Sequence, residues 1–159
     1  MSGRLVILGY GNPSRGDDAL GPLLLDRIAD LAASGPGPDL ITDFQLQVEH
    51  AADLEGAGLA LFLDAGASCS PPWRLERLRA QQDVGYTTHA LSPAAVLAVF
   101  RQVYGKEPPP AFLLTVAGES FELGAGLSKA AAAHLESAAG LMERLLAEPD
   151  AGYWQTLCA

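Results

Sequence analysis

Short apolar runs alternate with segments of helical periodicity along most of the chain, and this alternation restricts the fold more than any other feature. The runs expected to form strands are 4–8, 39–44, 59–63 and 112–116, with a weaker edge strand around 73–78. The segments expected to form helices are 20–31, 48–54, 94–104 and 129–146. Such alternation predicts an α/β fold, a largely parallel sheet with helices on both faces. At this length, residues 1–159 are expected to form a single domain.

Composition narrows the classes of function. Hydrophobic residues make up 49% of the chain, which is enough for a full core. With 10 basic and 19 acidic residues the net charge is −9, so neither a nucleic acid nor an anionic membrane is an expected partner. The first apolar run is too short for the core of a signal peptide, and no stretch approaches the roughly 18 apolar residues that span a bilayer. The two cysteines, Cys69 and Cys158, form no spaced pair, so we expect a cytoplasmic protein without a disulfide framework.

A glycine-rich turn, Gly9-Tyr10-Gly11-Asn12, follows the first expected strand. Sheets of this kind bind ligands at the carboxyl ends of their strands, so the turn lies where a site is expected. It is not a dinucleotide fingerprint, because the third glycine of that motif would fall at Ser14, and no P-loop lysine follows. The glycines would let the backbone fold back tightly and leave room for a ligand or another chain.

Three polar residues fall near expected strand ends or loops at the same edge of the sheet. Asp18 follows Asp17 at the start of the first helix, where Asp17 is expected to cap the helix and Asp18 is spare. Asp64 ends the most apolar strand, and His89 lies on the loop before the helix that begins at Pro93. Each also has an ordinary structural explanation, as a capping carboxylate or a surface histidine. Together, two carboxylates and an imidazole suit a borderline divalent ion such as nickel or zinc.

Residues 9–21, Gly-Tyr-Gly-Asn-Pro-Ser-Arg-Gly-Asp-Asp-Ala-Leu-Gly, resemble the opening motif of the hydrogenase maturation proteases. Asp64 after its strand and His89 before Ser92-Pro93 match the family's next two landmarks in order. The resemblance implies a three-layer α/β/α sandwich around a small twisted sheet. It also implies an endopeptidase that removes the C-terminal extension of the large-subunit precursor of a nickel–iron hydrogenase. We expect the chain to be a monomer. Asp18, Asp64 and His89 would be its catalytic and metal-contacting residues, with nickel supplied by the precursor and zinc or cadmium as substitutes.

One segment departs from the family pattern. Where many members have a glycine-rich Asp-Gly-Gly-Thr-x-Gly loop, this chain has residues 43–50, which resemble the branch that serves NAD-linked or bidirectional hydrogenases, as do residues 118–124. The candidates for substrate contact are Gly9, Gly11, Asn12, Gln45, Gln47, Glu49 and His50. Two other classes of function stay open, namely a non-catalytic metal-sensing binding module and an α/β protein that binds a small phosphate ligand.

Overall fold

The computed structural model describes residues 3–32, 35, 37–83 and 91–158. Its strands are β1 (Arg4–Tyr10), β2 (Asp39–Asp43), β3 (Ala57–Gly66), β4 (Trp73–Arg77) and β5 (Ala111–Ala117). They form one sheet in the order β2-β1-β3-β5-β4, in which only β4 runs antiparallel to its neighbour. The helices are α1 (Leu20–Leu31), α2 (His50–Asp53), α3 (Pro93–Tyr104), α4 (Lys129–Ala147) and α5 (Ala151–Leu157). A 3₁₀ turn, η1 (Gly16–Ala19), precedes α1.

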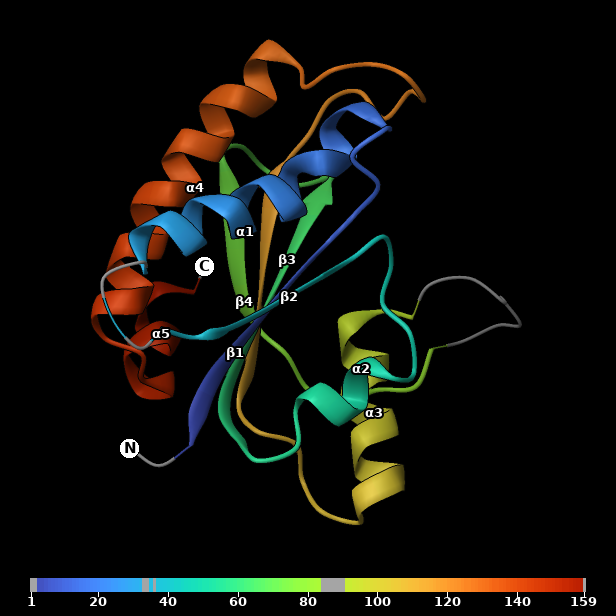
Figure 1. Ribbon diagram of the computed structural model, residues 1–159, viewed down its shortest axis with the longest axis vertical. Helices are drawn as coiled ribbons and strands as arrows, with labels where there is room; N and C mark the ends of the chain where they lie inside the picture. Colours follow the sequence, from blue (N-terminus) through green and yellow to red (C-terminus); the bar gives the residue numbers. More distant parts are fainter. Residues whose placement is uncertain (1–2, 33–34, 36, 84–90, 159) are drawn as a thin grey trace.

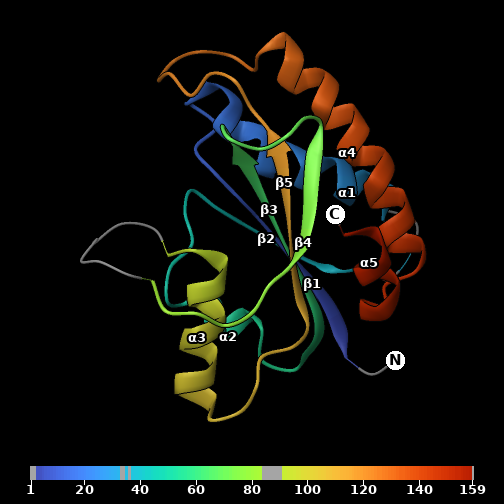
Figure 2. The ribbon, with the colours of Figure 1, turned by 180° about the vertical axis from the view of Figure 1, so that it is seen from behind.

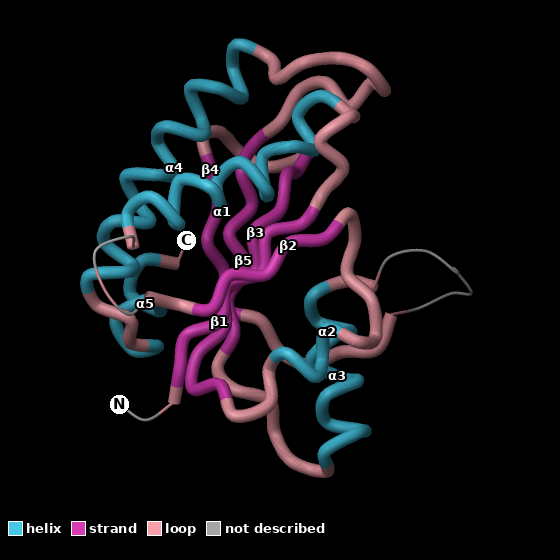
Figure 3. Tube along the Cα trace, viewed as in Figure 1, coloured by secondary structure: helices cyan, strands magenta, loops and turns pink. Residues whose placement is uncertain are grey.

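Helices cover both faces of the sheet, which confirms the expected α/β architecture (Figures 1 and 3). Helices α1, α4 and α5 pack on one face around alternate strand residues such as Ile7 and Leu61. Helices α2 and α3 cover the other face, where Val6 and Phe62 lie in a second apolar cluster. The central strands are buried on both faces, which explains why their sequences read as continuous apolar runs. Figure 2 shows β4 at the edge of the sheet, as expected.

Three elements differ from the sequence-based expectation. Strand β3 continues to Gly66, so Asp64 lies inside the strand and pairs with Thr115 of β5 rather than ending it. Helix α2 spans only His50–Asp53, which is shorter than expected. Helix α5 was not expected, because it buries one side chain, Trp154, and thus has no apolar periodicity. None of the described helices is long and apolar enough to cross a bilayer.

The motif glycines allow η1 and α1 to lie directly against the strand ends. A Cβ at Gly21 would stand 2.5 Å from the carbonyl oxygen of Tyr10 and 2.8 Å from that of Leu63. Gly11 has φ of 146°, and a Cβ there would stand 2.0 Å from the carbonyl oxygen of Asp18. The room that these glycines leave is therefore filled by the chain's own backbone. This close approach brings Asp18 to the end of β1.

Candidate functional site

Asp18 and Asp64 line one pocket at the carboxyl edge of the sheet. The pocket has a volume of about 410 Å³, and Tyr10, Gly11, Phe44 and Gln45 also line it, together with the start of α3. Asp18 comes from η1 and Asp64 from the last part of β3, so residues distant in sequence meet here because β1 and β3 are parallel neighbours. The structure thus brings two of the three residues of the expected metal set together.

Hydrogen bonds fix the direction of both carboxylates. The backbone N–H of Asn12 donates to Asp18 Oδ2 at 2.7 Å. The Tyr10 hydroxyl donates to Asp64 Oδ2 at 3.1 Å, and the N–H of Ala65 donates to Asp64 Oδ1 at 2.7 Å. Each carboxylate keeps lone pairs that these donors do not occupy, which a cation or a substrate proton can use.

The protonation behaviour of the pocket follows from its burial. Burial raises the pKa of Asp64 to about 6, against the lowering effect of the N–H of Ala65 and the Tyr10 hydroxyl, and the nearby charge of Asp18 raises it further. Burial, followed by the charge of Asp64, also holds the pKa of Tyr10 well above its usual value. Two carboxylates in one partly buried pocket repel each other, and a divalent cation between them would relieve that repulsion.

Asp17 does not cap a helix, contrary to the expectation from sequence. Neither η1 nor α1 has a side-chain cap. Instead, the fully buried Asp17 carboxylate accepts hydrogen bonds from the N–H groups of Glu119, Ser120 and Ser128 and from the Ser128 hydroxyl. Burial acts to raise the pKa of Asp17, but the four donors, the Ser128 hydroxyl foremost, hold it below its usual value. Asp17 therefore joins the turn that carries Asp18 to residues 118–128.

Residues 43–50 form the opposite side of the pocket. Phe44 and Gln45 line it, whereas the side chain of His50 is buried beneath the segment. The Nδ1 atom of His50 accepts the N–H of Gln47 at 2.8 Å, and its Nε2 lies 3.4 Å from the Asp43 carboxylate. Since Nδ1 is an acceptor here, the ring proton sits on Nε2, facing Asp43.

The remaining candidates for substrate contact have mixed surroundings. Gly11 lines the pocket, and Asn12 lies beside it through its N–H bond to Asp18. Gly9 instead faces α1, because a Cβ there would stand 2.8 Å from the carbonyl oxygen of Gly21. Glu49 is exposed just before α2. Whether Gln45, Gln47 or Glu49 contacts a substrate stays a prediction.

His89, the third member of the expected metal set, lies outside the described residues. Leu91, two positions further along the chain, lines the pocket with Ser92 and Pro93. The Ser92 hydroxyl accepts the N–H of Ala95 and so caps α3. Within the described part of the chain, no group of three His, Cys, Asp or Glu side chains is arranged to hold a metal ion.

Sequence reasoning missed Tyr10 and Phe44 as pocket residues. Tyr10 stands between the two motif glycines, and its hydroxyl becomes relevant only because β3 brings Asp64 next to β1. Phe44 is an exposed aromatic residue directly after β2, and this position at a strand end was the one available signal.

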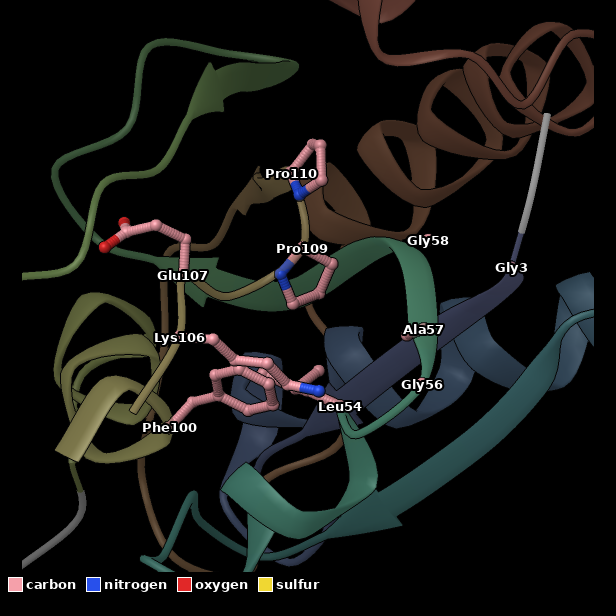
Figure 4. Close-up of a pocket in the computed structure, with 10 residues that line it drawn as sticks. All are labelled: Gly3, Leu54, Gly56, Ala57, Gly58, Phe100, Lys106, Glu107, Pro109 and Pro110. Carbon is pink, nitrogen blue, oxygen red and sulfur yellow. The ribbon is translucent and has the colours of Figure 1, made fainter. Parts of the chain in front are cut away.

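A second cavity, of about 510 Å³, lies at the amino ends of the strands (Figure 4). Gly3, Gly58 and Pro110 mark the starts of β1, β3 and β5 on its lining. The Lys106 side chain extends through this cavity, and its ammonium group pairs with Glu55 at 3.3 Å. Although larger, the cavity contains neither Asp18 nor Asp64, and it offers no paired carboxylates.

The sequence matches no protein-family model and no curated protein. Solved structures do match. The [NiFe] hydrogenase maturation protease HycI from Thermococcus kodakarensis superposes with a TM-score of 0.67 and 22% identity, over 92% of this chain and 94% of that one. The hydrogenase maturating endopeptidase HybD from E. coli gives a TM-score of 0.67 and 25% identity, over 92% and 93% of the two chains.

A third match is the hydrogenase 2 maturation peptidase from a Thaumarchaeota archaeon, with a TM-score of 0.60 and 24% identity. It covers 91% of this chain and 98% of that one. The matches extend over nearly the whole of each chain, so the likeness is one of the complete fold. The structural neighbours are those that the sequence motif predicted, and this chain has the fold of the hydrogenase maturation proteases.

Proposed function

We propose that this chain is a cytoplasmic endopeptidase that removes the C-terminal extension from the large-subunit precursor of a nickel–iron hydrogenase. The observation that carries the proposal is the pair Asp18 and Asp64 in one pocket at the carboxyl edge of the sheet. The matched structures, which are hydrogenase maturation proteases, support the same conclusion. Nickel belongs to the substrate in this proposal, since it arrives in the precursor.

The chemistry of the pocket fits a bound divalent ion. Asp18 and Asp64 supply oxygen ligands, and His89 would supply an imidazole nitrogen, a mixed set that nickel accepts. Burial raises the pKa of Asp64 more than its hydrogen bonds from Ala65 and Tyr10 lower it, so the ionised form is disfavoured in the free protein. A cation from the precursor would stabilise that form, so binding favours precursor that already contains metal.

Cleavage then depends on how the metal positions the precursor at the pocket. With the metal held by the two carboxylates, the scissile peptide bond of the precursor lies next to the pocket. A water molecule that gives a proton to one of the carboxylates, or that is polarised by the metal of the precursor, would add to the carbonyl carbon. The C–N bond would then break, and the proton taken from the water would pass to the departing amine. The Asn12 N–H keeps Asp18 in place, and the Tyr10 hydroxyl does the same for Asp64.

The phosphate-binding alternative loses its structural basis. The N–H of Gly11 donates to the Asp43 carbonyl at 3.1 Å, and the N–H of Asn12 donates to Asp18. The turn therefore has no pair of N–H groups directed at an anion, and two carboxylates line the pocket beside it. The metal-sensing module without peptidase activity remains as the competing function, and the cleavage assay separates it.

The test is incubation of the purified protein with nickel-loaded and nickel-free precursor, followed by mass spectrometry of the products. We expect cleavage of the nickel-loaded precursor only. Asp18→Asn should fold normally, because its amide oxygen can still accept the Asn12 N–H, yet it should not cleave. Asp26→Asn, a matched change at an exposed position of α1, should cleave like the wild type. Binding of loaded precursor without any cleavage would support the sensing module instead.

A further inference from the structure

One exposed apolar side chain, Phe44, lines the candidate pocket, and another, Leu123, lies on the loop that is hydrogen-bonded to the turn of Asp18. The described residues include five large hydrophobic side chains that are exposed, namely Leu31, Phe44, Val48, Val103 and Leu123. Three of them lie on two loops that follow strands of the sheet, residues 43–49 after β2 and residues 118–128 after β5. Figure 1 shows the first loop running from the end of β2 back to α2 and the second lying beyond the ends of β3 and β5. Phe44 and Leu123 are each 67% exposed, the highest values of the five, and Phe44 also lines the pocket of Asp18 and Asp64.

Both loops are held in place by buried polar groups. In the described residues, the buried polar or charged side chains are Asp17 and His50. His50 holds the loop of Phe44 through the Gln47 N–H and the Asp43 carboxylate. Leu46, buried in the same loop, accepts the N–H of Leu91 at 3.1 Å.

The loop of Leu123 is hydrogen-bonded to the turn that carries Asp18. Asp17 accepts four hydrogen bonds from this loop. The N–H of Gly124, next to Leu123, donates to the Ser14 carbonyl at 2.7 Å, and the N–H of Gly16 donates to Ala125 at 3.1 Å. The turn that carries Asp18 and the loop that carries Leu123 are thus one hydrogen-bonded unit.

A buried polar group costs free energy unless it is hydrogen-bonded, and Asp17 and His50 are both bonded to the loops that cover them. These bonds fix the backbone of both loops, so the loops are preorganised with Phe44 and Leu123 exposed. Preorganised loops bind a partner at a lower entropic cost. We propose that Phe44 and Leu123 are substrate-specificity residues, which hold apolar segments of the hydrogenase precursor on either side of its nickel.

This inference rests on the proposed function. Its test measures two quantities for each variant, the steady-state cleavage of nickel-loaded precursor and the binding of that precursor. Phe44→Ser and Leu123→Ser should each raise KM and weaken binding about tenfold, since truncated apolar anchors of interfaces cost this much. The value of kcat should stay within about threefold of the wild type, because neither change removes a carboxylate. The double variant should multiply the two effects, as the loops act at separate positions.

Val103→Ser and Leu31→Ser are the matched controls, because they remove exposed apolar side chains from the ends of α3 and α1. They should leave KM unchanged, and thermal melts should show that all four variants are folded. If Phe44→Ser and Leu123→Ser behave like these controls while the wild type cleaves, the inference is overturned and the proposed function stands. If the wild type neither binds nor cleaves the precursor, both are overturned.

Discussion

Replacing Asp64 by Asn should make the metal-free protein more stable at neutral and alkaline pH. The substitution keeps the shape of the side chain, and the amide can still accept the N–H of Ala65 and donate to the Tyr10 oxygen. It removes a charge whose burial is unfavourable, as the raised pKa of Asp64 shows. A residue that binds the cation of a substrate would thus reduce the stability of the free protein.

The size of the effect follows from that pKa. Burial raises it from 3.8 to about 6, and each pH unit corresponds to about 1.4 kcal/mol. Folding therefore favours the protonated form of Asp64, so wild-type stability is lost as the pH rises from about 4 through about 6. We expect Asp64→Asn to exceed the wild type by about 2.4 kcal/mol more at pH 8 than at pH 4, because at pH 4 the unfolded carboxyl is already partly ionised.

The assay is urea unfolding of both proteins at pH 4, 6 and 8, in the presence of a chelator so that no metal binds Asp64. Asp26→Asn is the control, since this exposed position of α1 should change stability by about 0.5 kcal/mol or less at every pH. The reasoning would be refuted by a stability difference between Asp64→Asn and the wild type that does not grow with pH.

Three further predictions follow from the same structure. Asp17→Asn should lower the free energy of unfolding by about 2–4 kcal/mol, because an amide cannot accept all four hydrogen bonds. In urea unfolding this loss should shrink below about pH 4, as the wild-type carboxylate protonates. A variant as stable as the wild type would contradict the role of the buried carboxylate. Gly21→Ala should lower the melting temperature strongly through its clashes with Tyr10 and Leu63, whereas Gly140→Ala, in open space on α4, should raise stability by about 1 kcal/mol. Purified protein should hold less than one equivalent of metal in elemental analysis, because an open site binds less firmly than a closed four-ligand site; stoichiometric zinc after dialysis would indicate a resident metal instead.

Local sequence was sufficient for most of the secondary structure. Strand β1 and helix α1 follow from an apolar run, a glycine turn and helical spacing of leucines. Ser92 and Pro93 fixed the start of α3 because capping depends on residues close in sequence. Helix α5 escaped notice, since the indole N–H of Trp154 finds its partners, the carbonyls of Leu145 and Glu148, only in the folded chain.

The candidate site was predictable in part, for a topological reason. Parallel strands end at the same edge, so the sequence alone predicts that Asp18 and Asp64 lie near one another. The role of Asp17 could not be expected, because its partner Ser128 lies 111 residues away. An aspartate at the start of a helix has the same local sequence whether it caps that helix or bonds a distant loop.

The sequence by itself determined the alternation of strands and helices along the chain as far as α4, the glycine turn and the family that the chain resembles. These features depend on neighbouring residues and their spacing. Only the tertiary structure decided that Asp17 and His50 hold two loops, that Tyr10 bonds Asp64, and that Phe44 is exposed at the pocket and Leu123 on the loop bonded to the Asp18 turn. These features depend on which segments meet when the sheet forms. Burial and electrostatic repulsion act through space, and no pattern of adjacent residues encodes them.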